Sequence, residues 1–323
     1  MAVFLCLDYL GAWGTRVIKS YTKKALSFEE QLTHLKGHGL GVADEAAALK
    51  QLACVSYYRL SGYLYPFRER SDQGKVLSRF KPAANFEEAA KLYEFDRRLR
   101  LLVLDAIERV EVAVRTRVTY EIGHRYGPFG HVEAVNFHPQ FQHDKWLKKI
   151  EAEAAQSSDE FIRHYKANYD GFPRLPVWML TEVMSFGALS RLYQGLKNES
   201  GSDAEDKKAV SQYFNIHHKR LGDWLHTLTY VRNLCAHHSR LWNRALSIKP
   251  DKVKDPLWLP PFTPRNDRLF YVLLMLRHLL KASKASDVWA CEVTRLLAPF
   301  ADIEEYRVAM GIPKDWRDHP LWK

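Results

Sequence analysis

The sequence predicts an all-α fold, and three observations support that prediction. Residues 86–122 contain neither glycine nor proline. Apolar residues recur through them at spacings of three and four, which marks the buried side of a helix: Val103, Ile107, Val110, Val114 and Val118. A second helical pattern, over Leu221–Arg244, has one apolar and one polar side. Strands are expected at most as a short pair around 76–80, inside a polar connection over 71–85.

Two shorter helices are predicted before the long one. Ser27, followed three residues later by Glu30, forms a capping box that starts a helix, and Gly37 with the two glycines after it ends that helix. Asp44 is expected to cap the next helix. This helix leads into an aromatic segment that Pro66 interrupts.

Further helices are predicted along the rest of the chain. Gly123 is expected to end the long helix. The later helices are expected over 144–165, 178–196 and 206–213, from Asn266 or Asp267 to 280, and over 286–298 and 302–310. Prolines between 250 and 264 predict an extended connector. The C-terminal tail is expected to dock through Trp316 and Trp322.

The segment Leu221–Arg244 carries the residues that are expected to act chemically. At about 100° per residue, its apolar side consists of Trp224, Leu228, Val231, Leu234, Cys235, Leu241 and Trp242. Its polar side consists of Arg232, Asn233, His237, Arg240, Asn243 and Arg244. Asn233 and His237 are four residues apart and therefore share one side of a helix. Arg232 directly precedes Asn233 and lies about 100° from it around the helix axis. These three side chains can converge on a small anion.

Arginine and histidine together supply what cleavage of RNA by its own 2′-hydroxyl requires. A histidine has a pKa near neutral and acts as a base or an acid. An arginine holds a phosphate with a planar fork of donors and stabilises charge in the transition state. Asn233 is expected to orient the phosphate or the imidazole, and His238 either helps in this or only packs. The alternative is a surface helix with a few solvated basic residues.

Several strings of the sequence resemble one protein family. Arg232 to His237 reads Arg-Asn-three residues-His, which resembles the signature of HEPN-type ribonucleases. The wider string VRNLCAHHSRLWNR resembles the bacterial Abi-like family of abortive-infection proteins within that superfamily. Further blocks resemble this family in the expected order: KKALSFEEQLTHLKGHGL (23–40), VSYYRLSGYLYPFR (55–68), YEFDRRLRLLVLDAIERVEVAVRTRV (93–118), YGP (126–128) and PVWMLTEVMSFGALSRLY (176–193). The resemblance therefore extends over most of the chain.

The resemblance implies an all-helical phage-defence protein that acts as a metal-independent endoribonuclease, with Arg232 and His237 as catalytic residues. It implies a HEPN-type helical bundle as a core over roughly 86–245. Additional N- and C-terminal helices complete a single domain over 21–323. The family-like pattern begins near Tyr21, so residues 1–20 are expected to be a loosely held extension.

The resemblance also implies partners. RNA is the expected substrate. HEPN units often pair so that two motif helices face one another, and a homodimer is therefore expected. An antitoxin protein or a noncoding RNA that restrains the activity is left open.

Glu108, Glu111 and Arg115 form a stripe beside the buried side of the long helix. Glu111 and Arg115 either form a surface ion pair of small energetic value, or the stripe abuts the face that carries Arg232 and His237 and orients them. The resemblance favours the second interpretation, because it includes this block. The expected RNA-binding residues outside the motif are Arg240, Asn243 and Arg244.

A second pair of the same residue types, Arg117 and His124, satisfies a loose form of the HEPN signature. Three features argue against a second active motif. Arg117 is not followed by asparagine, it falls on the apolar side of the helix, and Gly123 is expected to end the helix before His124. An active second motif would give one chain two half-sites, and the chain would then need no partner.

Composition narrows the functional classes. The net charge of +10 and the pI of about 9.3 favour a polyanionic partner.

The four cysteines lack metal-ligand spacing, and the histidines between 124 and 164 are expected to be solvated loop residues: His124, His131, His138, His143 and His164. Neither a metal nor a cofactor is expected. The sequence shows a poor secretory signal and no apolar run long enough to cross a bilayer, so no membrane span and a cytoplasmic location are expected.

Three other classes of function compete with the nuclease. The first is a non-catalytic RNA-binding or regulatory protein on the same helical scaffold. The second is a DNA-binding protein that uses the helices around Asp44–Arg59. The third is a purely structural protein-interaction role. Cleavage of RNA, a preference for duplex DNA, or no affinity for nucleic acid at all would discriminate among them.

Overall fold

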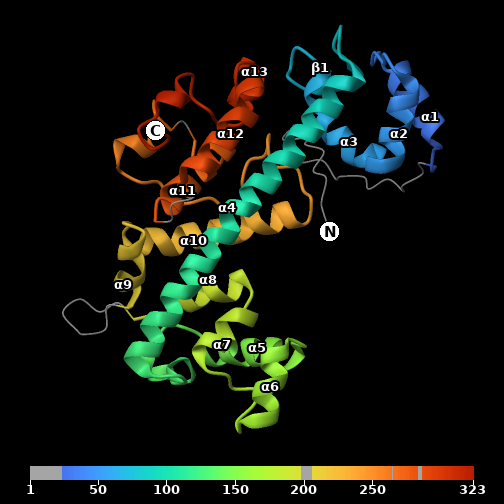
Figure 1. The fold of residues 1–323 in the computed structure, drawn as a ribbon. Helices are drawn as coiled ribbons and strands as arrows, with labels where there is room; N and C mark the ends of the chain where they lie inside the picture. Colours follow the sequence, from blue (N-terminus) through green and yellow to red (C-terminus); the bar gives the residue numbers. More distant parts are fainter. Residues whose placement is uncertain (1–23, 198–205, 264, 283–285) are drawn as a thin grey trace, which may run out of the picture. The chain divides into compact units, whose positions relative to one another are not determined.

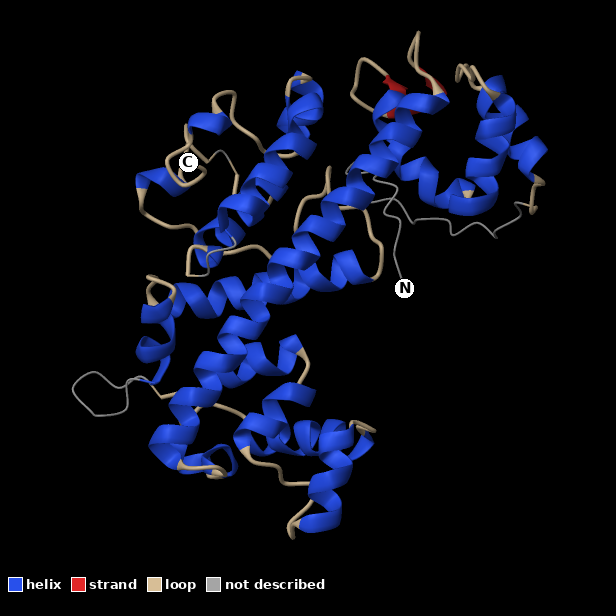
Figure 2. Cartoon of the chain, in the orientation of Figure 1, coloured by secondary structure: helices blue, strands red, loops and turns tan. Residues whose placement is uncertain are grey.

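The computed structural model describes residues 24–197, 206–263, 265–282 and 286–323. The extension expected over residues 1–20 lies outside the described residues. Helices dominate the described chain, and one antiparallel pair of short strands is its only sheet (Figure 2). The all-α prediction is therefore confirmed. The chain divides into two compact units, Met1–Ala90 and Lys91–Lys323.

The N-terminal unit contains three helices and the strand pair. Its elements are α1 (Phe28–Gly37), α2 (Glu45–Val55), α3 (Tyr57–Leu64), β1 (Arg68–Arg70) and β2 (Val76–Phe80). The capping box at Ser27 is confirmed, because both of its reciprocal hydrogen bonds with Glu30 are present. The Asp44 side chain accepts a hydrogen bond from Ala47 N at 2.9 Å, as predicted for the cap of α2. Strand β2 forms where the pair was expected, but its partner β1 lies before the polar connection predicted over 71–85.

Helix α4 (Phe86–Tyr126) is 41 residues long. Its predicted buried side is confirmed, because every valine and isoleucine assigned to it is at most 1% exposed. The predicted end at Gly123 is wrong. Gly123 stays helical and faces Val177, whereas Gly127 adopts the left-handed conformation, with φ of 77°, just after the last helical residue.

Two predicted single helices are each divided in two. Residues 144–165 form α5 (His143–Gln156) and α6 (Glu160–Asn168), because Ser157 has an extended backbone. Residues 178–196 form α7 (Val177–Val183) and α8 (Phe186–Gly195). The Ser185 hydroxyl accepts from Ala188 N at 3.3 Å and so begins a new helix.

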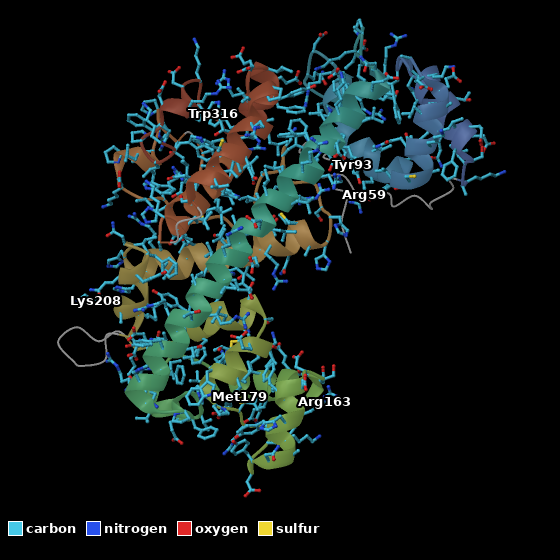
Figure 3. All side chains as sticks on the ribbon, in the orientation of Figure 1. Arg59, Tyr93, Arg163, Met179, Lys208 and Trp316 are labelled. Atoms are coloured by element: carbon cyan, nitrogen blue, oxygen red, sulfur yellow. The ribbon has the colours of Figure 1, made fainter. Side chains whose placement is uncertain are left out.

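The rest of the C-terminal unit is formed by α9 (Asp206–Tyr213), α10 (His218–Ala236), α11 (Leu269–Leu280), α12 (Ser286–Ala301) and α13 (Glu304–Ala309). The predicted docking of the tail is confirmed. Trp316 and Trp322 are both buried, and Trp322 Nε1 donates to Thr294 Oγ1 of α12 at 3.1 Å. Figure 3 labels Trp316 within this C-terminal part, and Lys208 on the outward face of α9.

Helix α4 is the element on which the C-terminal unit is built. The rings of Phe95 and Phe300 stack with centroids 4.0 Å apart, and Trp289 Nε1 donates to Leu102 O at 2.8 Å, so α12 lies along its first half (Figure 1). Farther along α4, the hydroxyls of Thr119 and Thr181 are hydrogen-bonded at 2.8 Å. Helix α7 therefore lies against its second half.

Two of the histidines expected to be solvated are buried. His131 is 1% exposed and His143 is 6% exposed. His143 Nε2 donates to the carbonyl of His131 at 2.9 Å, and the His143 ring lies beside Phe137 and Trp146. The prediction fails for these two because their burial comes from tertiary packing of the turn after α4, which local spacing does not reveal.

Candidate functional site

The candidate site lies at the C-terminal end of α10. His217 caps the start of this helix, because its ring accepts a hydrogen bond from Lys219 N at 3.3 Å. Its predicted apolar side is buried, with Trp224, Leu228 and Val231 at most 1% exposed. The helix packs against α8, where Gly187 leaves room for Thr229. The apolar side of α10 therefore fixes which way the polar residues of its last turn face.

The helix ends at Ala236, so the prediction that it continues to Arg244 is wrong. Two backbone hydrogen bonds close it, from His238 N to Cys235 O at 3.0 Å and from Ser239 N to Leu234 O at 2.8 Å. This pair of bonds is a Schellman motif, and His238 occupies its left-handed position with φ of 56°. The position usually belongs to glycine, and another residue there costs about 1 kcal/mol.

The three motif residues lie at this helix end. His237 N donates to Asn233 O at 3.0 Å, so the predicted four-residue relation persists through the end of the helix. The side chains of Asn233 and His237 are exposed, and that of Arg232 is half-buried. Within the described residues, neither Arg232 nor His237 forms a side-chain hydrogen bond or an ion pair. A permanent cation and an imidazole are thus both accessible at one end of one helix.

A buried carboxylate fixes the chain immediately after the motif. Asp96 of α4 is 0% exposed, and it accepts hydrogen bonds from Leu241 N at 3.1 Å and from Trp242 N at 2.8 Å. Arg100, also buried, donates to the other oxygen of Asp96. The apolar side predicted for Leu241 and Trp242 is buried as expected, but in a loop that α4 holds.

Sequence reasoning missed Asp96 and Arg100. A signal was present, because Asp96 lies four residues after Leu92 and three before Leu99, on the apolar stripe of α4. A charged residue on such a stripe requires a buried partner.

Cys235, inside the motif, is not a candidate nucleophile. Burial, reinforced by the nearby charge of Asp96, raises the pKa of its thiol to about 12. A buried thiol that stays protonated is unreactive.

The three residues predicted to bind RNA beyond the motif lie in the loop after α10. Arg244 Nε donates to Arg240 O at 2.7 Å, and Arg268 Nη1 donates to Asn243 Oδ1 at 3.4 Å. All three are half-buried. Their observed contacts shape the loop, and RNA binding by them stays a prediction.

Glu111 and Arg115 form a partly buried ion pair. Arg115 Nη2 donates to Glu111 Oε1 at 2.7 Å and to Met184 O at 3.1 Å, which ties α4 to the turn between α7 and α8. Glu108 is exposed. Within the described residues, no hydrogen bond or ion pair joins these three side chains to the motif. That they orient Arg232 and His237 stays a prediction.

Arg117 and His124 are both helical residues of α4. Arg117 Nη2 lies 3.4 Å from Glu121 Oε1, and its guanidinium lies between the rings of Tyr120 and Tyr213. The His124 ring stacks on Tyr120 and donates from Nδ1 to the Tyr120 carbonyl at 3.0 Å. Both side chains therefore contact aromatic rings.

In the part of the chain that the structure describes, no group of three or more His, Cys, Asp or Glu side chains is placed to hold a metal ion. Among the same residues, no helix is long and apolar enough to cross a membrane.

Comparison with protein families matches residues 50–243 to the family described as Abi-like protein. These residues make up more than half of the chain. The chain belongs to the Abi-like protein family. Comparisons with curated proteins and with solved structures find no match. The matched span of this Abi-like protein begins in α2, includes all of α4, and ends just after Trp242, so it contains both the motif and its Asp96 anchor.

Proposed function

We propose that this Abi-like protein is a HEPN-type endoribonuclease that cleaves RNA in abortive infection, without a metal. Family membership supports a role in this form of phage defence. The observation that best supports the nuclease is the last turn of α10, where Arg232 and His237 are accessible and, within the described residues, unpaired. The net charge of +10 favours a polyanionic substrate.

In the proposed reaction, the RNA supplies the nucleophile, and these side chains supply proton transfer and charge stabilisation. The RNA 2′-hydroxyl attacks the adjacent phosphorus, and the bond from phosphorus to the 5′-oxygen breaks. His237 takes the proton from the 2′-hydroxyl or gives one to the departing 5′-oxygen. Arg232 binds the non-bridging oxygens and stabilises their charge, while Asn233 orients the phosphate or the imidazole. The products carry a 2′,3′-cyclic phosphate and a 5′-hydroxyl.

One imidazole can perform one of the two proton transfers at a time. Pairing of two chains with their motifs facing one another supplies a second imidazole, and we therefore propose a homodimer. Supporting roles belong to the other predicted residues. Glu108, Glu111, Arg115 and His238 position the motif, and Arg240, Asn243 and Arg244 bind the flanking phosphates. An antitoxin protein or a noncoding RNA is a further proposed partner.

The test is RNA cleavage by purified protein in buffer containing a chelator. His237→Ala and Arg232→Ala are each expected to lower the rate by about 100-fold or more. The double variant is expected to be little slower than either single one, because the two groups act on one transition state. His226→Ala is the matched control, since His226 is an exposed histidine on the same helix. Unchanged rates for His237→Ala and Arg232→Ala would show that these residues are not the catalytic ones.

The second candidate is a non-catalytic RNA-binding or regulatory protein, which the positive charge also favours. It predicts a salt-dependent gel shift with intact RNA, without cleavage and unchanged in His237→Ala.

A further inference from the structure

The last third of α4 carries a continuous stack of rings around one cation. The Arg117 guanidinium lies 5.1 Å from the ring centroid of Tyr213 and 5.3 Å from that of Tyr120. On Tyr120, the His124 ring stacks at 3.9 Å between centroids, with an interplanar angle of 31°. The Tyr213 hydroxyl donates to Ala282 O at 3.2 Å, which fixes that end of the stack. The arrangement is held in place and reaches the surface.

A pocket of about 440 Å³ opens beside this stack, between α4 and α7. Its lining residues are Thr116, Thr119, Tyr120, Gly123, His124, Trp178 and Glu182. Tyr120 and Trp178 are each 49% exposed. Gly123 also lines the pocket, and a Cβ there would meet Val177 at 3.6 Å and Trp178 at 3.9 Å. The pocket is therefore lined by exposed aromatic rings.

Glu182 supplies the polar end of the pocket. Its carboxylate is exposed, and within the described residues it has no hydrogen bond or ion pair. The threonine hydroxyls are engaged already, Thr116 with Val112 O at 2.9 Å and Thr119 with Thr181. Glu182 is thus the acceptor that a ligand would meet.

We propose that this surface, the aromatic groove (Arg117, Tyr120, His124, Trp178, Glu182 and Tyr213), binds unpaired bases of single-stranded RNA. The rings of Trp178 and His124, which line the pocket, provide stacking faces for bases, and Arg117 holds Tyr120 in place from outside it. A carboxylate accepts hydrogen bonds from exocyclic amino groups, so adenine and cytosine fit better than uracil. The proposal rests on RNA as the ligand of the proposed function, and it adds a second contact to that ligand.

The aromatic groove lies away from the motif. Arg117 is twenty-one residues beyond Asp96 along α4, about 32 Å at the helical rise. Asp96 in turn holds the segment that follows the motif. The groove is therefore separate from the residues proposed to cleave RNA, and it selects RNA that is unpaired where the groove binds it.

The experiment measures affinity for 2′-O-methyl RNA, which cannot be cleaved by 2′-hydroxyl attack, with labelled oligomers of about twelve nucleotides. Tyr120→Ala and Trp178→Ala are each expected to weaken binding about tenfold. Trp178→Phe keeps a ring and is expected to bind nearly as the parent does. Tyr169→Ala is the control, because Tyr169 is a tyrosine even more exposed than Tyr120 (59% against 49%) that does not line the pocket.

The base preference gives a second readout that does not depend on removing a ring. The parent is expected to bind oligoadenylate and oligocytidylate more tightly than oligouridylate, and Glu182→Gln is expected to reduce that difference. Parental affinity in both alanine variants, an equal loss in Tyr169→Ala, or a shift from dimer to monomer in Trp178→Ala without a change in affinity would each overturn the proposal. Because the probe is uncleavable, this result is independent of whether His237→Ala abolishes cleavage.

Discussion

At the scale of single residues, burial of His131 disfavours the protonated form of its imidazole. Its side chain is buried, and its Nδ1 has no hydrogen-bond partner within the described residues. Burial, with a smaller contribution from His143, lowers the pKa of His131 from 6.5 to about 4. The imidazole is therefore neutral in the folded chain at pH values where the unfolded chain already binds a proton.

This difference predicts a loss of stability in acid. Between pH 6.5 and pH 4 the unfolded state binds more protons at His131, so the free energy of unfolding falls as the pH falls through this range. Over the whole range, His131 lowers the free energy of unfolding by about 3 kcal/mol. Urea unfolding at a series of pH values is expected to show a shallower decline in His131→Asn than in the parent. His226→Asn, at an exposed position, should keep the parental slope, and a parental slope in His131→Asn would contradict the assignment.

At the scale of the element, the end of α10 depends on α4. Asp96 accepts two backbone hydrogen bonds from the loop that follows the motif and forms an ion pair with Arg100. Asp96→Ala leaves the buried Arg100 without its counter-charge, and removing one partner of a buried pair costs about 3–5 kcal/mol. We expect that loss in urea unfolding, together with slower RNA cleavage because the motif end is no longer held.

The matched control is Asp105→Ala. Asp105 pairs with Arg109 four residues on in the same helix, but both side chains are more than 40% exposed. Such a pair contributes less than about 1 kcal/mol. Equal losses of stability in the two variants would show that Asp96 does not anchor the loop.

Local chemistry explains which elements could be predicted from the sequence. Ser27 and Asp44 cap their helices through bonds that span three residues, and the buried side of α4 follows from spacing alone. The stop of α10 could not be predicted, because His238 takes a backbone conformation that usually marks glycine. The predicted end of α4 at Gly123 was wrong for the opposite reason. This glycine lies inside the helix, where its missing side chain allows close packing against α7.

The residues of the candidate site also differ in whether local sequence could predict them. Arg232, Asn233 and His237 were found from their residue types and spacing, which a helix converts directly into proximity. Asp96, in contrast, contacts a loop 145 residues away, and no local rule pairs the two. The burial of His131 likewise results from tertiary packing.

At the scale of the whole molecule, the matched family span and the rest of the chain have different tasks. Residues 50–243 hold the motif and its anchor. Helix α12 lies outside this span, and its Phe300 and Trp289 cover the first half of α4 from which Asp96 comes. The C-terminal helices thus support the site without contributing a proposed catalytic residue.

The central claim is that this Abi-like protein breaks RNA with the end of α10, and one measurement tests it most directly. The intact chain and the His237→Ala variant are expressed side by side in bacterial cells, and RNA ends are sequenced from both. The account predicts growth arrest, with new 2′,3′-cyclic phosphate and 5′-hydroxyl ends, in cells with the intact chain alone. The same new ends in cells with His237→Ala, or growth arrest without any new ends, would contradict it.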